Sequence, residues 1–190
     1  MSITRSRQAV ITDGLAVHPE LVEMAKERRA QAVAGYAGAA ARFGLSFVFL
    51  WAFLDKLFGW GKATPSKGSW LNGGSPTTGF LSHAKGPFGT MFNNMAGFAI
   101  YDWLFMAALL GIGAALALGI GLRIAAVSGV LLMVMMWAAS LPIASNPILD
   151  DHLIYAVVLV WIAAASAGRT LGLATWWERQ ALVQRLPILR

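Results

Sequence analysis

Four long apolar runs, with charged residues held near their ends, constrain this chain more than any other feature of its sequence. The second and third runs each hold about 20 residues, enough for a helix to cross the ~30 Å hydrocarbon core of a bilayer. Of the 190 residues, 57% are hydrophobic and 13% are charged, and a water-soluble domain of that size needs more polar surface. We therefore expect an all-α integral membrane protein, a four-helix bundle with spans at residues 39–60, 102–121, 124–143 and 152–168.

The positions of the basic residues predict the orientation of these helices, because cytoplasmic loops carry an excess of Lys and Arg. With both termini inside, eleven of the 15 basic residues fall on the cytoplasmic side. The other four are Lys56, Lys62, Lys67 and Lys85. We expect a multi-pass protein of the plasma membrane with cytoplasmic N- and C-termini. The net charge of +6 then reflects membrane topology, so we expect no nucleic-acid partner.

The spans lie in a domain covering residues 39–169, with a different kind of segment on each side. Residues 1–38 predict a cytoplasmic arm and a helix, which starts near Pro19 because proline suits the first helical turn. We expect no cleavable signal peptide in this region. Residues 170–190 predict an amphipathic helix lying on the inner membrane surface, with its adjacent tryptophans, Trp176 and Trp177, at the headgroup level.

The long loop at residues 61–101, between the first two spans, is the least regular part of the sequence. It holds eight of the twenty glycines and three of the seven prolines. Loops of this length in compact proteins are often functional. We expect it to fold back over the outer mouth of the bundle, with FNNMAGFAI forming a short helix that leads into the second span.

The first span poses a problem of length. Only 12 uncharged residues separate Arg42 from Asp55, and they make about 18 Å of helix, too short to cross the hydrocarbon. Either Arg42 or the Asp55–Lys56 pair therefore lies at membrane depth, where an ionisable group indicates a functional site. Lys56 could bind an anion or a headgroup carbonyl, while Asp55 could pair with it or with a neighbour. The alternative is a structural salt bridge that ties this span to Asp102 or Asp150.

His152, at the start of the fourth span, follows two carboxylates, Asp150 and Asp151. A histidine beside carboxylates can pass protons near neutral pH. The alternative is a capping role at the helix start, for which aspartate is well suited. His83 in the loop is the other outer histidine, but the sequence favours neither a haem held by these two histidines nor a carboxylate–His zinc site.

Other residue patterns predict packing and exclude some kinds of chemistry. The run GIGAALALGIG places small residues at positions 111, 115 and 119, a stripe that would let a neighbouring helix approach closely. The methionines near Trp137 predict packing more than a cofactor site. The chain has no cysteine, which excludes disulfides, Cys-ligated iron–sulfur clusters and thiol relays. We expect no haem, iron–sulfur or metal cofactor.

Several blocks together resemble a known family: RFGLSFVFLWAFLDKLFG, WLNGGSPTTGFL, DWLFMAALLGIGAALALGIGLRIAAVSG and NPILDDHLIYA. Over about residues 40–177 the chain is similar to DoxX/DoxD membrane proteins, and within them to the large subunits of thiosulfate:quinone oxidoreductases. The resemblance implies a four-helix membrane protein that oxidises thiosulfate to tetrathionate and passes the electrons to membrane quinone. It also implies a second, smaller subunit.

We therefore expect a quinone-linked oxidoreductase subunit whose site lies at the outer side, in contact with lipid and quinone. One alternative is a non-catalytic accessory subunit of a respiratory supercomplex or another oxidoreductase assembly. A carrier or channel is disfavoured, because the spans hold few central polar groups and no inverted repeat. The predicted catalytic residues are Lys56, Asp55, Asp102, Asp150, Asp151 and His152. The predicted substrate or quinone-binding residues are Lys56, Trp60, Trp70, His83, Trp103 and Tyr155.

Overall fold

The computed structural model describes residues 19–144 and 146–189, and all the regular elements within them are helices. Three helices are long and apolar enough to cross a membrane: α2 (Pro19–Phe58), α5 (Ala99–Leu118) and α6 (Leu122–Ala139). A fourth, α7 (Asp151–Ala164), is also apolar but has only 14 residues. The predictions of an all-helical chain and of apolar helices suited to a membrane are confirmed.

The chain divides into two compact units, Met1–Ala37 and Gly38–Arg190, and α2 contributes to both. In the first unit α2 begins at Pro19, as predicted, and nearly all the side chains from residue 20 to residue 37 are exposed. An ion pair at 2.7 Å joins Lys26 to Glu23 there. The predicted N-terminal arm lies outside the described residues.

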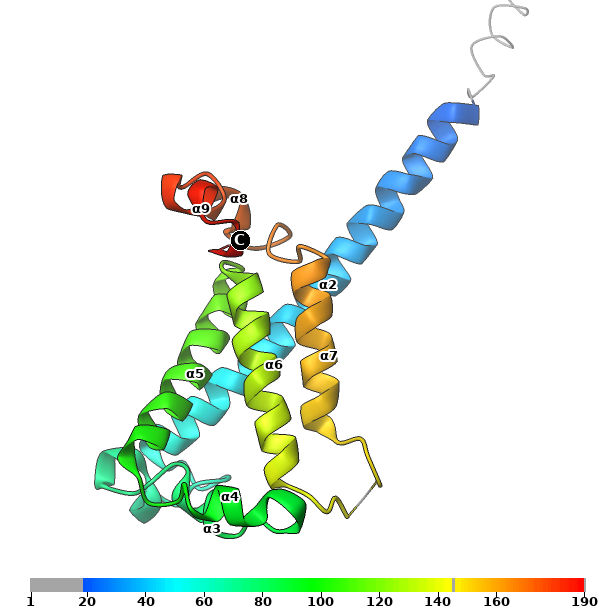
Figure 1. Cartoon of the computed structure of the whole chain (residues 1–190). Helices are drawn as coiled ribbons and strands as arrows, with labels where there is room; N and C mark the ends of the chain where they lie inside the picture. Colours follow the sequence, from blue (N-terminus) through cyan, green and yellow to red (C-terminus); the bar gives the residue numbers. More distant parts are fainter. Residues whose placement is uncertain (1–18, 145, 190) are drawn as a thin grey trace, which may run out of the picture. The chain divides into compact units, whose positions relative to one another are not determined.

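The second unit is built around one apolar core to which all four helices contribute. Figure 1 shows α5, α6 and α7 beside one another, with the cyan part of α2 crossing behind them. Outward-facing residues on the same helices are apolar too, as in a membrane rather than in water. Buried core residues include Leu45, Phe49, Met106, Leu109, Ile112, Leu116, Met133, Ala156, Leu159 and Ile162.

Glycines allow close contacts between segments, but not at every position that the sequence predicts: Gly119 lies close to Gly168, whereas Gly111 does not approach a neighbour. A Cβ added to Gly113 on α5 would lie 2.8 Å from the side chain of Leu50 on α2, whereas one added to Gly111 would meet nothing within 4 Å. Ser46 Oγ on α2 also donates a hydrogen bond of 2.8 Å to the carbonyl of Gly113. The predicted stripe is therefore wrong at position 111, because the face of α5 that meets α2 is the one with Gly113.

Arg42 on α2 is wholly buried at one end of this core, where it joins α2 to α5 and to the segment after α7. Its guanidinium donates hydrogen bonds to the carbonyls of Leu116 and Ala117, the latter at 2.8 Å, near the C-terminus of α5. It also donates to Leu171 O at 2.8 Å in the segment after α7. The last carbonyls of a helix lack helical partners and carry partial negative charge. The buried cation is thus matched by backbone oxygens.

The helix boundaries differ from the predicted ones by several residues. Gly119 and Gly121 adopt left-handed backbone conformations, with φ of 71° and 59°. They end α5 at Leu118 instead of residue 121 and place the tight connection to α6 two residues earlier than expected. The third helix ends at residue 139 instead of 143, with Pro142 following, and α7 ends at residue 164 instead of 168. Apolar periodicity does not mark such ends, which depend on local backbone geometry.

The C-terminal segment is not the single amphipathic helix predicted for residues 170–190. Within the part of it that the structure describes there are three short pieces, α8 (Ala174–Trp177), α9 (Ala181–Arg185) and η4 (Pro187–Leu189). The backbone is extended at Gln180, and proline at position 187 cannot continue a helix. Large apolar side chains stay exposed in this segment, among them Leu171, Trp176 and Leu182.

The segment between α2 and α5 is folded into short helices and is not structureless. The short helix predicted at FNNMAGFAI (residues 92–100) is not formed as such: α4 (Gly89–Asn93) ends within it, and turns at residues 94–97 separate α4 from α5. The pieces are η1 (Ser66–Gly68), η2 (Trp70–Asn72), α3 (Thr78–Ser82), η3 (Gly86–Phe88) and α4. We call residues 59–98 the loop, and the end of the helices beside it the loop end.

Candidate ligand-binding cavity

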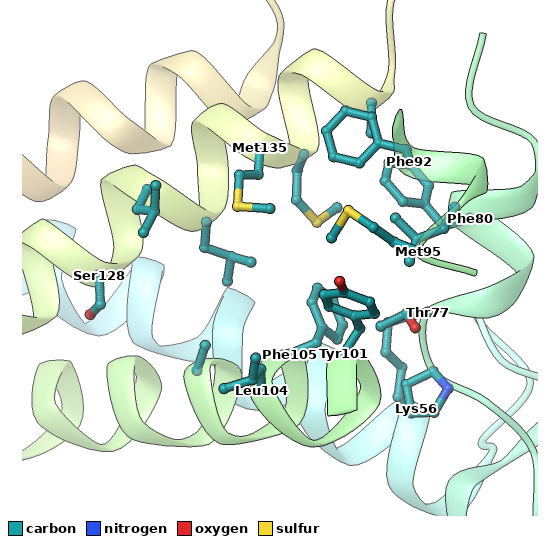
Figure 2. A pocket seen from close by; sticks show the side chains of 17 residues that line it. Lys56, Thr77, Phe80, Phe92, Met95, Tyr101, Leu104, Phe105, Ser128 and Met135 are labelled. Atoms are coloured by element: carbon teal, nitrogen blue, oxygen red, sulfur yellow. The ribbon is translucent and has the colours of Figure 1, made fainter. Parts of the chain in front are cut away.

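An apolar cavity of about 420 Å³ lies between α5 and α6, with the loop across one end. Figure 2 shows side chains from both helices and from the loop converging on this space. Its volume falls within the range of small-molecule sites, which are mostly apolar with a few polar groups. The cavity therefore has the size and the character of a site for an apolar or amphipathic ligand.

The walls come from segments far apart in the sequence. From α5 come Leu104, Phe105 and Ala108, and from α6 come Ser128, Leu131 and Met135. The loop adds Phe80, Leu81, Phe92 and Met95. Leu104 and Leu131 line the cavity and are also 59% and 62% exposed, so the cavity opens on the surface between α5 and α6. Because both helices are apolar enough to span a membrane, that opening suits a ligand arriving from lipid.

Lys56, from the last turn of α2, lies at the loop end of the cavity beside Thr77 (Figure 2). Its Nζ is 5.7 Å from the centroid of the Phe105 ring, a weak cation–π arrangement. Among the described residues that line the cavity, Lys56 is the only one that carries a full charge. It forms no salt bridge or side-chain hydrogen bond within residues 19–144 and 146–189. The expected pairing of Lys56 with Asp55 is thus not formed.

Asp55 is 1% exposed and fixes the start of the loop. Its Oδ1 accepts a hydrogen bond from the backbone N–H of Lys62 at 3.3 Å, and its Oδ2 accepts one from Ala63 at 3.0 Å. Hydrogen bonds to an ionised carboxylate are stronger than those between neutral groups. Asp55 therefore folds the chain after α2 back onto the helix end. Its predicted catalytic role stays a prediction.

Asp102 on α5 is also buried and holds a second point of the loop. Its Oδ1 accepts hydrogen bonds from Ser75 Oγ at 2.8 Å, from the Thr77 backbone N–H at 3.0 Å and from Thr77 Oγ1 at 2.6 Å. Pro76 and Thr77 line the cavity, as does Tyr101 beside Asp102 in sequence. Asp102 thus positions one wall of the cavity. No salt bridge joins it to α2 within the described part of the chain.

Asp150, Asp151 and His152 come together at the start of α7, away from the cavity lining. Asp150 caps α7 by accepting the N–H of Leu153 at 3.2 Å, and its other oxygen lies 2.7 Å from His152 Nδ1. Asp150 thus has the helix-capping role that the sequence offered as the alternative to proton transfer. Ligand atoms of the three side chains lie within 4.8 Å of one another, a spacing that a cation could share, although Asp150 already has two partners.

The five remaining predicted binding residues lie outside the cavity lining. Trp60 is 5.7 Å from Phe58 by ring centroids, and Trp70 meets Trp103 edge to face at 4.6 Å. His83 Nδ1 is 2.7 Å from the carbonyl of Gly79, and Tyr155 packs against the core. The sequence reasoning missed most of the lining residues: Pro76, Thr77, Phe80, Leu81, Phe92, Met95, Leu104, Phe105, Ala108, Ser128, Leu131, Leu132, Met135, Met136 and Ala139.

Comparisons with protein-family models, with curated proteins and with solved structures give no match to this chain. The DoxX/DoxD resemblance therefore stays a prediction from the sequence blocks that carry it. The geometry of the cavity and the charge at its loop end are the observations from which a function can be argued. They favour an amphipathic ligand with an apolar body and a polar or charged head.

Proposed function

We propose that this protein is a membrane subunit of a quinone-linked oxidoreductase of the DoxX/DoxD kind, and that its cavity binds the quinone. The observation that carries the proposal is an apolar cavity open between two membrane-length helices, with one ammonium group at its loop end. A membrane quinone has an apolar tail and a ring with two carbonyl oxygens. Those two parts match the apolar walls and the lysine.

The proposed topology is a four-helix bundle in the plasma membrane with both termini in the cytoplasm. In it α7 is the fourth span, although its 14 residues make only about 21 Å of helix. The core shared by all four helices and the apolar surface around them support this topology. This topology puts the loop, and with it the Lys56 end of the cavity, at the outer face.

In the bound state the quinone ring lies at the loop end, and its tail runs along α5 and α6 towards the opening at Leu104 and Leu131. Lys56 donates a hydrogen bond to one carbonyl oxygen. A donor that carries a charge makes such a bond about twice as strong as a neutral one. The Phe105 ring, near Lys56, offers an apolar face for the quinone ring.

The proposed reaction joins two thiosulfate ions through a new sulfur–sulfur bond to give tetrathionate, and this releases two electrons. The quinone accepts both electrons and two protons to become quinol. Thiosulfate approaches from outside, where the loop lysines Lys62, Lys67 and Lys85 attract a dianion. The proton donors in this scheme are the outer carboxylates and His152. A second, smaller subunit completes the enzyme.

The test is thiosulfate-dependent reduction of a short-chain quinone by the protein purified with its natural partners. Ala108→Phe fills the cavity, and we expect it to lower the rate at least tenfold. Ala107→Phe is the matched control, because Ala107 is the next residue of α5 but is exposed and does not line the cavity. Lys56→Ala should lower the rate as well.

Two results would overturn the proposal. One is the absence of any thiosulfate-dependent quinone reduction in a preparation that retains its partners. The other is an Ala108→Phe variant, folded and assembled, that keeps the full rate. Co-purification with a respiratory complex whose activity is unaffected by either substitution would instead support an accessory role.

A further inference from the structure

Lys56 carries a positive charge, but no negatively charged side chain forms a salt bridge with it in the described part of the chain. It is half-buried, and the other described residues lining the cavity with it are uncharged. A charged group beside apolar walls loses hydration, which is unfavourable unless a partner replaces the lost water. Fully buried amines in proteins are therefore normally paired.

The nearby carboxylates are already engaged elsewhere. Asp55 precedes Lys56 in sequence, but both of its oxygens accept backbone N–H groups from residues 62 and 63. Asp102 uses one oxygen for three hydrogen bonds to Ser75 and Thr77. Neither carboxylate forms a salt bridge with Lys56 in the described part of the chain. The ammonium of Lys56 therefore has no salt-bridge partner in the described part of the chain, although the charge of Asp55 lies next to it in sequence.

We propose that the cavity selects ligands whose head carries a negative charge, with Lys56 as the residue that recognises the charge. The quinone part of this inference rests on the proposed function. An ionised quinone or another anionic amphiphile binds more tightly than its neutral counterpart of the same size. The Phe105 ring alone cannot substitute for the anion, because a cation–π contact at this distance is weak.

The contact between Lys56 and a ligand also affects how easily that ligand is reduced. Negative charge develops on the quinone oxygens as electrons are added, and a fixed cation stabilises charge that develops during a reaction. A ligand held at Lys56 is therefore easier to reduce than the same ligand in the open bilayer. The selectivity for charge and the use of a quinone are separate statements, so they need separate probes.

The test compares two matched pairs of ligands on the full chain in phosphatidylcholine nanodiscs. The first pair is an alkyl hydroxynaphthoquinone, ionised at neutral pH, and an alkyl methylnaphthoquinone with the same tail, which is neutral. The second pair is a long-chain carboxylate and the alcohol of equal length. Binding is followed by tryptophan fluorescence or calorimetry. We expect the anionic member of each pair to bind about tenfold more tightly, a difference of about 1.4 kcal/mol.

Variants assign the effect to Lys56. Lys56→Met keeps the length of the side chain without its charge, and we expect it to remove the preference within each pair because the anionic member loses more affinity than the neutral one. Lys26→Met is the control, because it removes the same charge from a lysine that does not line the cavity. Thermal unfolding of each variant confirms that it is folded.

The outcomes separate the two proposals. Equal binding of both members of each pair, or a preference that survives Lys56→Met, overturns the charge selectivity and leaves quinone binding intact. Tight binding of the carboxylate without binding of either naphthoquinone supports the charge selectivity and removes the quinone from the proposed function. Failure of all four ligands to bind overturns both.

Discussion

The contact between α2 and α5 at Gly113 gives a prediction whose sign follows from the geometry. Replacement of Gly113 by alanine puts a methyl group 2.8 Å from Cγ and Cδ2 of Leu50 and 3.2 Å from its backbone nitrogen. The leucine side chain can rotate away, but the backbone nitrogen belongs to α2 and cannot. The two helices must therefore separate, and the hydrogen bond from Ser46 to the carbonyl of Gly113 must lengthen.

The expected size follows from two opposing effects. Overpacking of a close contact costs about 1–3 kcal/mol. Alanine gains up to about 1 kcal/mol over glycine in a water-exposed helix, but less here, because an unfolded membrane helix keeps much of its helical backbone. Gly113→Ala should thus be destabilised by about 1–2 kcal/mol. Gly111→Ala, where the methyl group meets nothing within 4 Å, should be unchanged or stabilised by less than about 1 kcal/mol.

The assay is unfolding in mixed micelles with increasing sodium dodecyl sulfate, followed by circular dichroism or by tryptophan fluorescence. The two variants differ only in which face of α5 carries the added methyl group, so propensity and detergent effects cancel between them. If Gly111→Ala is the less stable of the two, the face of α5 that meets α2 has been assigned wrongly. Equal stabilities would show that the contact at Gly113 is not close.

Three further predictions concern polar contacts made by Arg42, Asp102 and Asp150. Arg42→Met leaves carbonyls at the end of α5 without their hydrogen-bond donor, and it should destabilise the protein by about 2–3 kcal/mol in the same unfolding assay. Arg42→Lys should have an intermediate stability, because one ammonium group cannot reach all the oxygens that the guanidinium binds. Asp102→Ala should raise amide hydrogen exchange around Thr77 more than Asp102→Asn, which keeps an acceptor oxygen; equal exchange in both would refute the positioning role. Asp150→Ala removes a helix cap and should cost about 1 kcal/mol, with faster exchange confined to the first turn of α7; no change in exchange there would argue against the cap.

Much of the fold could be predicted because apolar runs in this chain are long and separate. Three of the four predicted spans overlap α5, α6 and α7 closely, with ends displaced by one to four residues. The displacement has a local cause, since Gly119 and Gly121 turn the chain before the apolar residues run out. The first helix is one continuous element from Pro19 to Phe58. The alanines between its charged N-terminal part and its apolar C-terminal part favour helix, so the helix is not interrupted there.

The candidate site was only partly predictable. Lys56 could be found because a charge near the end of an apolar run is conspicuous in any sequence. Met135 could not, because α6 is apolar on nearly all sides and no periodicity shows which of its faces lines a cavity. Phe80 and Phe92 could not either, because they lie in the loop, where no regular helix pattern indicates a direction. The loop residues reach that cavity only through tertiary contacts made by Asp102 with Ser75 and Thr77, which no local pattern encodes.

The most direct test of the central claim is photoaffinity labelling of the intact protein in a membrane with an azido-substituted alkyl quinone, followed by peptide mass spectrometry. We expect labels on residues 104–108 of α5 and 128–136 of α6, where the cavity lies. An excess of the unlabelled quinone should remove them, and so should Ala108→Phe, while Ala107→Phe should leave them in place. Labels spread evenly over the lipid-facing surfaces, or competed labels confined to α7, would contradict it.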